Sequence, residues 1–364
     1  MKVSALFTGV CIVFCGTLLP QALFAQSKER TINLEMGPPL KAAVEAAKNR
    51  QFDVALAKLK EAEAKRKTAY EQFVVNQTLA SIYGGQQKFA ELAAIQEKLL
   101  ETPQFMAPEQ AQGIVKSIAQ SYSRTPQTAK TIEYSKRWLQ DRPNDTDILQ
   151  TLGQTYYTAK DYKLCHQTFA TAVSIAEKGG NKPAENWLRF SQTCAGDAGD
   201  DGAEAQAFEK LARYYPKPEY WQAYLRRMQR ADKADVAKFN WLRLMGETSS
   251  LKDAEDYMIY ARLAITDYGV ACEAVKVLDE GFSRKILGAD QNAKARQQNT
   301  LNKAKEQVQA DKARLAQLAT DADKDTTGQT NFDLGMIYFG CGQYDQALSN
   351  LEKSLKKGGL KEPG

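Results

Sequence analysis

The sequence predicts an all-α protein, a solenoid of stacked helical hairpins. Residues 152–172 and 334–354 of the 364-residue chain follow one order: large, small, two variable positions and an aromatic, then small, large and small. Gly153 and Gly335 occupy the first small position in each stretch. Apolar residues recur there with the 3.6-residue period of a helix, not with the alternation of a strand. One hairpin cannot bury its apolar face alone, so we expect the hairpins to stack.

This order of residues resembles the tetratricopeptide repeat, a helical hairpin of about 34 residues. The resemblance implies a right-handed α-solenoid with a groove for a partner. In the hairpin that begins at Leu152, we expect Gly153 and Cys165 at the closest approach of the two helices. Tyr156 and Phe169 are expected to fill the space between hairpins.

The first four hairpins follow in order along the chain. The first covers about 40–67, with Ala55 and Leu59 on the inner stripe of its second helix. The second lies around 79–99 and the third around 118–139. The third ends where Pro stops the helix, in the segment Asp141-Arg142-Pro143-Asn144, and Asn or Asp can cap the next helix. The fourth starts one full repeat later, and adjacent units at the natural period strengthen the repeat assignment.

The pattern loosens after the fourth hairpin. A fifth hairpin is expected over 186–211, a sixth over 220–245 and a seventh over 254–282. Residues 289–319 are rich in Ala, Gln and Lys with few large apolar residues, which predicts one long, exposed helix. The eighth hairpin, 331–357, fits the pattern closely.

The start of the chain is typical of a secretory signal peptide. Lys2 is followed by an uncharged, mostly apolar run over 3–19, and small residues allow cleavage near Ala25 or, as a second choice, Ala22. The alternative is an uncleaved membrane anchor, since about 17 apolar residues is the lower limit for a span. Loss of the leader lowers the formal net charge from +5 to +4.

The predicted organisation therefore has four parts. Solenoids normally finish with a polar capping helix, so we expect the last part to precede a further repeat or to have its apolar face covered by a partner. The parts are a signal peptide over 1–25, a solenoid over 26–288, a long exposed helix and linker over 289–325, and a C-terminal hairpin over 326–364.

Two local motifs resemble a group of exported proteobacterial tetratricopeptide proteins. They are Pro183-Ala184-Glu185-Asn186-Trp187-Leu188 and the stretch 211–221, which contains Tyr-Pro-Lys-Pro-Glu-Tyr-Trp. Some members of this group accompany TonB-ExbB-ExbD energy-transducing systems. The resemblance, over about 40–360, implies a periplasmic scaffold or accessory role without catalysis, and envelope proteins, including TonB/ExbB/ExbD-type components, as partners.

The residue types exclude most chemistry. His166 is the single histidine, which removes most metal sites and catalytic triads, and on a helix it would not face the adjacent Cys165. We expect it to face solvent. A run of Asp321, Asp323 and Asp325 resembles the start of a calcium loop but lacks the required Gly and the bidentate Glu. We therefore expect no metal, no cofactor and no catalytic residues.

Nucleic acid and direct membrane binding are also disfavoured. The mature chain has no block of like charges and no basic patch with interleaved aromatics. No later segment has the length of a membrane span, so membrane contact would come only through partners or an uncleaved leader.

Four cysteines remain after cleavage: Cys165, Cys194, Cys272 and Cys341. In an oxidising envelope compartment they could pair in three ways. Cys165 and Cys194 also fit buried positions of the repeat, so unreactive buried thiols remain an equal alternative.

The remaining candidate for function is the groove wall, which the first helix of each hairpin forms in this repeat family. Lys116 and Arg124 are expected there as exposed cations that a partner could use and that add little to stability. By register the wall presents Gln77, Ser81, Lys116, Gln120, Arg124, Gln150, Gln154, Tyr157 and Thr158, and near the end of the chain Phe332, Met336 and Phe339.

These features predict a non-catalytic periplasmic protein-interaction scaffold of the cell envelope. Two alternatives remain open. One is an assembly factor for outer-membrane or pilus components, and the other is a binding module for small ligands or peptidoglycan fragments.

Overall fold

The computed structural model describes residues 30–231 and 235–360. Seventeen α-helices and one short 3₁₀ helix account for the regular structure in these ranges, and no strand occurs in them. The all-α prediction is therefore confirmed for the part of the chain that is described. The leader expected over 1–25 and the last four residues lie outside it. None of the described helices combines the length and hydropathy that a membrane span requires.

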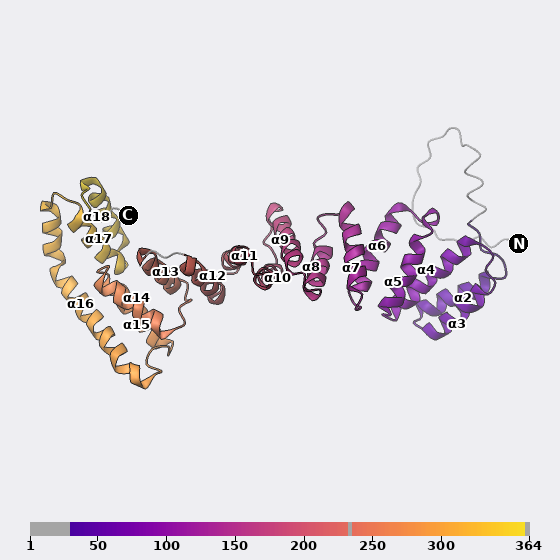
Figure 1. Cartoon of the computed structure of the whole chain (residues 1–364), viewed down its shortest axis with the longest axis horizontal. Helices are drawn as coiled ribbons and strands as arrows, with labels where there is room; N and C mark the ends of the chain where they lie inside the picture. Colours follow the sequence, from indigo (N-terminus) through magenta and orange to yellow (C-terminus); the bar gives the residue numbers. More distant parts are fainter. Residues whose placement is uncertain (1–29, 232–234, 361–364) are drawn as a thin grey trace, which may run out of the picture. The chain divides into compact units, whose positions relative to one another are not determined.

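The chain divides into two compact units, Met1–Ala207 and Phe208–Gly364, with the boundary inside α11. In the first unit, successive helices fold back on one another and each packs mainly on its neighbours in the chain (Figure 1). Its helices are α2 (Gly37–Lys48), α3 (Phe52–Glu63), α4 (Ala69–Gly85), α5 (Phe89–Leu100), α6 (Pro108–Tyr122), α7 (Thr128–Asp141), α8 (Thr146–Thr158), α9 (Tyr162–Lys178), α10 (Glu185–Asp197) and the first part of α11 (Asp201–Tyr214).

The second unit has two helix pairs, a long helix and a final pair. Its helices are α12 (Pro218–Ala231), α13 (Asp235–Glu247), α14 (Ala254–Thr266), α15 (Ala271–Ser283), α16 (Gln291–Lys324), α17 (Gln329–Gly340) and α18 (Tyr344–Lys357). One hydrophobic core joins α12 to α17 in this unit and includes Tyr257, Phe239 and Leu301.

Several hairpins share one turn between their two helices. In each of these turns a residue with positive φ ends the first helix, and the next N–H donates to the carbonyl five residues earlier, as at Asp161 and Tyr156. The positive-φ residues are Arg50, Gln87, Lys160, Gly199 and Gly342. Three of these five are not glycines, so the sequence reveals this turn poorly where another residue accepts the left-handed conformation.

The small residue of the repeat does what the sequence predicts. A Cβ on Gly153 would lie 2.6 Å from a ring carbon of Phe169, and a Cβ on Gly335 would lie 2.9 Å from Leu351 in the last hairpin. Helices α8 and α9 therefore approach too closely for a side chain here. The Phe169 ring also stacks on Phe190 of α10 at 4.9 Å, so it fills the space between hairpins.

Both pairs of cysteines form disulfides. Cys165 of α9 is bonded to Cys194 of α10, with a Cα–Cα distance of 5.8 Å, and both residues are buried. The bond therefore links the hairpin of α8 and α9 to the next hairpin, which begins with α10. Cys272 of α15 is bonded to Cys341, with a Cα–Cα distance of 5.0 Å. All of α16 lies in the loop that this second bond closes.

The single long helix that the sequence predicts is present as α16 and most of its residues are exposed, but one face of it is buried. It packs against α14, α15 and α17, and Leu301 and Ala304 are buried in the core of the second unit. Small alanines allow a helix backbone to approach its neighbours closely, so a face with few large apolar residues can still be buried. Asp311 is buried as well, where Gln307 and Arg314 of the same helix donate to its carboxylate.

Candidate binding site

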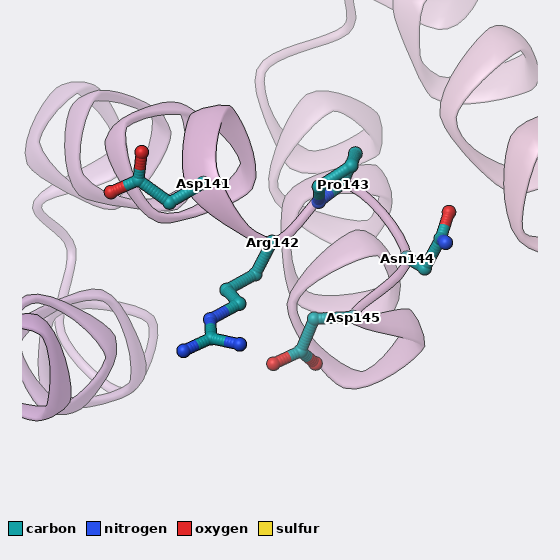
Figure 2. A pocket seen from close by; sticks show the side chains of 5 residues that line it. All are labelled: Asp141, Arg142, Pro143, Asn144 and Asp145. Carbon is teal, nitrogen blue, oxygen red and sulfur yellow. The ribbon is translucent and has the colours of Figure 1, made fainter. Parts of the chain in front are cut away.

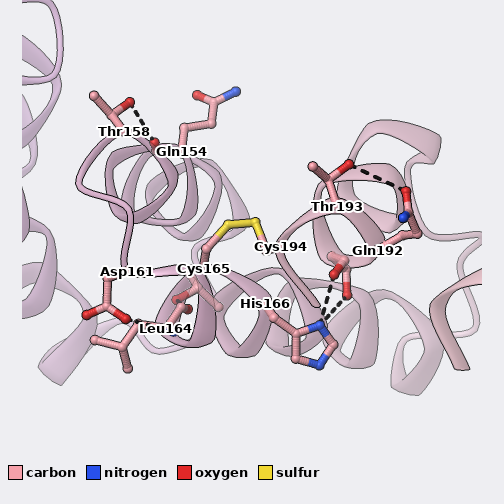
Figure 3. Close-up of a disulfide and its surroundings, with 11 residues drawn as sticks. Gln154, Thr158, Asp161, Leu164, Cys165, His166, Gln192, Thr193 and Cys194 are labelled. Atoms are coloured by element: carbon pink, nitrogen blue, oxygen red, sulfur yellow. Dashed lines mark hydrogen bonds between the residues drawn. A yellow bond between two sulfur atoms is a disulfide. The ribbon is translucent and has the colours of Figure 1, made fainter. Parts of the chain in front are cut away.

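Helices α6, α8 and α10 form a continuous wall in the first unit, because α8 contacts both of the others. Two of the predicted residues on α8 carry carboxamides. The Gln150 carbonyl accepts hydrogen bonds from Trp187 Nε1 at 2.8 Å and from Asn186 Nδ2 at 3.4 Å. Gln150 therefore ties α8 to α10. Gln154, one turn further along α8, is exposed, and Figure 3 shows its carboxamide extending away from the helix.

Tyr157 adds an aromatic surface next to Gln154. Its side chain is 37% exposed, and its ring packs against Tyr162 at 5.8 Å and edge-on against Phe190 at 6.1 Å. The ring is thus held by aromatic neighbours while one side remains accessible. An anchored aromatic of this kind loses little conformational entropy when a partner covers it.

Lys116 does not have the role that the sequence predicts. Its ammonium lies 2.7 Å from the Asp145 carboxylate and 5.4 Å above the Trp138 ring. The same carboxylate accepts from Trp138 Nε1 at 2.8 Å and from the Ile148 N–H at 3.2 Å, where it caps α8. Lys116 and Asp145 side chains are 29% and 14% exposed. Lys116 therefore joins two hairpins and is not a free cation.

Electrostatics agree with this structural role. Burial acts to raise the pKa of Asp145, but the Lys116 ammonium, the Ile148 N–H and the Trp138 indole outweigh it and hold the pKa below its usual value. The segment from Asp141 to Asp145 also lines a cavity of about 370 Å³. Figure 2 shows Asp141 and Asn144 on opposite sides of the segment, away from the Arg142 and Asp145 side chains.

The other polar residues of the predicted wall lie in different surroundings. Gln120 is exposed on α6, and Arg124, just after the end of α6, is exposed as predicted, with its guanidinium 4.6 Å above the Phe89 ring. Gln77 and Ser81 are exposed on α4, two helices earlier. Helices α6 and α8 thus contact each other, and the α4 pair lies two helices earlier in the chain.

The three apolar residues predicted near the end of the chain belong to the second unit. Met336 packs against the core of that unit, and the Phe339 ring has the Arg243 guanidinium at 5.1 Å and Tyr344 at 5.9 Å. Phe332 is 37% exposed. Two of the three residues therefore serve packing, and only Phe332 keeps a surface that a partner could reach.

Sequence reasoning missed a polar pocket at one end of the wall. It has a volume of about 280 Å³ and lies where the end of α6, the start of α7 and one face of α8 meet. We call it the hydroxyl pocket, and its lining is Ser123, Thr125, Thr128, Thr131, Thr151, Gln154, Thr155 and Thr158. The signal in the sequence is the spacing of the three α8 threonines at i, i+4 and i+7, which places them on one helix face.

The groups that could carry catalysis are engaged in structure. Cys165 is in a disulfide, and the adjacent His166 is half-buried, with Nδ1 3.0 Å from the Ser191 carbonyl oxygen (Figure 3). The expectation that His166 simply faces solvent is therefore wrong, because it contacts α10. Asp325 accepts from the backbone and hydroxyl of Thr327 and of Thr330 at the start of α17. These contacts lower the pKa of the Asp325 carboxyl. Within the described residues, no group of three or more His, Cys, Asp or Glu side chains could hold a metal ion.

Comparison with known proteins identifies one repeat directly. The tetratricopeptide repeat family model matches residues 328–356, which are α17 and α18, so the chain carries a tetratricopeptide repeat there. No curated protein matches the chain. Earlier helix pairs follow the same plan of two helices joined by the shared turn.

Several solved structures are similar at low identity. YrrB, described as a TPR protein with an unusual peptide-binding site, is 13% identical over 55% of this chain and 93% of its own, with a TM-score of 0.38. A tetratricopeptide repeat protein from Parabacteroides merdae is 14% identical over 75% of this chain and 99% of its own, with a TM-score of 0.37. The TPR2AB-domain–pHSP90 complex of yeast Sti1 is 14% identical over 74% of this chain and 98% of its own, with a TM-score of 0.39.

Proposed function

We propose that this chain is a non-catalytic protein-interaction scaffold whose partner lies along the wall of α6, α8 and α10. Tetratricopeptide repeats serve in general as such scaffolds. The observation that carries the proposal is the grouping of Gln154 with the anchored Tyr157 ring on α8. A carboxamide offers both a donor and an acceptor, which matches the peptide backbone, and the aromatic ring offers apolar contact area.

We further propose that the chain works in the periplasm, as an accessory of envelope systems such as TonB-type transport. The leader pattern of the sequence and the two local motifs support this location. The disulfides Cys165–Cys194 and Cys272–Cys341 support it too, because such bonds persist in oxidising compartments and are rare in the cytosol.

The wall is tested by capturing partners from native envelopes, with crosslinking and mass spectrometry, using two matched double variants. Gln120→Ala with Gln154→Ala changes exposed carboxamides on α6 and α8, whereas Gln140→Ala with Gln167→Ala changes exposed carboxamides on α7 and α9. We expect the first pair to weaken capture roughly tenfold, the effect of losing about 1.4 kcal/mol, and the second pair to leave capture unchanged. Equal recovery with both pairs would place the interface elsewhere.

The location is tested separately by fractionation and N-terminal sequencing of the exported protein. We expect a mature chain that begins near Gln26 and migrates faster on a gel without reductant. Recovery of the reduced chain from the cytosol with Met1 still present would overturn the periplasmic proposal and would leave the wall proposal standing.

A further inference from the structure

Most of the hydroxyls in the hydroxyl pocket present acceptors and not donors. A Ser or Thr hydroxyl has one proton to donate and two lone pairs that accept. Six of the seven hydroxyls that line the pocket donate that proton to a nearby backbone carbonyl of their own helix or turn, as Thr155 does to Thr151 at 2.7 Å. The other five are Ser123, Thr125, Thr131, Thr151 and Thr158. These six hydroxyls therefore offer a ligand their lone pairs, and the Thr128 hydroxyl and the Gln154 carboxamide lie beside them.

The helix ends around the pocket add a negative electrostatic potential to that of the lone pairs. Ser123 is the residue at which α6 ends, and Thr158 is the last residue of α8, so two helix C-termini meet the pocket. Each carries a partial negative charge from the aligned peptide dipoles of its helix. The start of α7 at Thr128 opposes them with one helix N-terminus. No charged side chain lines the pocket. The site therefore favours a donor-rich cation.

The size of the pocket limits the ligand. Pockets for whole small molecules measure about 300–1,000 Å³, and the hydroxyl pocket at about 280 Å³ falls at the lower edge of that range. It suits one side chain better than a complete small ligand. Gln154 belongs both to this pocket and to the wall of α6, α8 and α10, so a chain lying along the wall passes the mouth of the pocket.

We propose that the hydroxyl pocket binds an arginine side chain of the partner segment that lies along the wall. This inference rests on the proposed scaffold function and names what the partner carries. A guanidinium has five N–H donors in a plane and no acceptor, which matches several oxygens around one cavity. It is also more weakly hydrated than a lysine ammonium, so it enters an uncharged pocket at lower cost. Arginine is preferred over lysine for both reasons.

The direct test is a titration of the full exported chain, with threonine methyl groups labelled for NMR. The probes are Nα-acetyl-arginine amide, the corresponding lysine amide and the corresponding citrulline amide, which is uncharged and nearly the same shape as the arginine compound. We expect saturable shifts of the Thr155 and Thr158 methyl signals with the arginine probe, at least threefold weaker binding of the lysine probe, and no saturable shift with citrulline. Equal responses to arginine and citrulline, or no saturable shift with arginine, would overturn the proposal.

A matched pair of variants tests the location. Thr151→Val with Thr155→Val replaces two acceptors by methyl groups of the same shape, and Thr171→Val does so on α9, where the hydroxyl donates to Gln167 in the same way but outside the pocket. We expect the first change to weaken arginine binding at least fivefold and the control to leave it unaltered, with circular dichroism unchanged in both. Shifts that persist in the double variant would overturn the assignment.

Partner capture separates this inference from the function on which it rests. If capture falls with the Gln120 and Gln154 variant but stays intact in Thr151→Val with Thr155→Val, the pocket proposal fails and the scaffold proposal stands. Loss of capture in both, together with arginine-selective shifts, supports the two proposals jointly.

Discussion

Replacing Asp145 by alanine should loosen the junction between the third and fourth hairpins. One carboxylate at this position makes three contacts: an ion pair with Lys116 at 2.7 Å, a hydrogen bond from Trp138 Nε1 at 2.8 Å, and the cap on the Ile148 N–H at 3.2 Å. All three are lost together. The ion pair crosses from α6 to α8, so the effect should reach both hairpins.

The magnitude follows from these contacts. Loss of a helix cap costs about 1 kcal/mol. Loss of a hydrogen bond to a charged acceptor costs about 1.5–3 kcal/mol, and a partly exposed ion pair adds up to about 1 kcal/mol. Because the contacts share one carboxylate they are not additive, and we expect a total of about 3 kcal/mol for Asp145→Ala. Asp145→Asn keeps a capping oxygen and should cost about 1 kcal/mol.

The assay is hydrogen exchange with mass spectrometry, since repeats contact mainly their neighbours and the loss should begin locally. Peptides from α6, α7 and α8 should lose protection while those from α2 and α3 keep theirs. Asp141→Ala is the matched control, because it removes an exposed carboxylate from the same segment (Figure 2). Its exchange should equal that of the unmodified chain.

Acid provides a second readout. The folded-state pKa of Asp145 is lowered, so its contribution is fully present above the unfolded pKa of about 3.9 and is lost as pH falls through the folded value. The difference between the unmodified chain and Asp145→Ala should therefore be constant near neutral pH and shrink only below about pH 4. Unchanged protection of α8 at neutral pH, or a difference that persists well below pH 4, would refute this reasoning.

Three further predictions concern stability. Gly153→Val should lower the free energy of unfolding, measured in urea, by about 1–3 kcal/mol, because a Cβ there would lie 2.6 Å from a facing ring. Gly113→Ala, with open space around it, should raise the free energy of unfolding by about 0.5–1 kcal/mol. Equal urea midpoints for the two variants would contradict this packing. Burial acts to raise the pKa of Glu71, but four N–H donors lower it overall. Glu71→Gln should therefore lower the free energy of unfolding by about 2–3 kcal/mol at neutral pH. A loss of the same size well below about pH 4 would be inconsistent with this cause. Reducing the Cys272–Cys341 bond should lower the stability of the second unit by about 2–4 kcal/mol. The measurement is thermal unfolding, with the unfolding of the first unit, which contains Cys165–Cys194, monitored in parallel. An unaltered transition of the second unit would argue against the bond.

Local periodicity explains what the sequence predicted well. The positions of the helices follow from the 3.6-residue spacing of apolar residues, which each segment carries within itself. Gly153 and Gly335 are visible for the same reason, because a close helix approach demands a small residue at a fixed place in the repeat. The C-terminal hairpin, where the pattern is closest to the family, is also where the family model matches.

The partners of long polar side chains were not visible in the same way. Lys116 and Arg124 follow the register of a wall, but the groups that hold them, Asp145 and Phe89, lie on neighbouring helices about a hairpin away. Likewise α16 has few large apolar residues, and only its packing against α14, α15 and α17 shows that one face is buried.

By itself, the sequence determined that this chain forms helical hairpins. Tertiary structure decided which cysteines pair, which cations are free, and that hydroxyls from three separate elements close around one pocket. The physical reason is the distance along the chain between the residues that interact. Helix formation depends on residues three or four apart, whereas ion pairs, disulfides and pockets depend on how the faces of different helices meet.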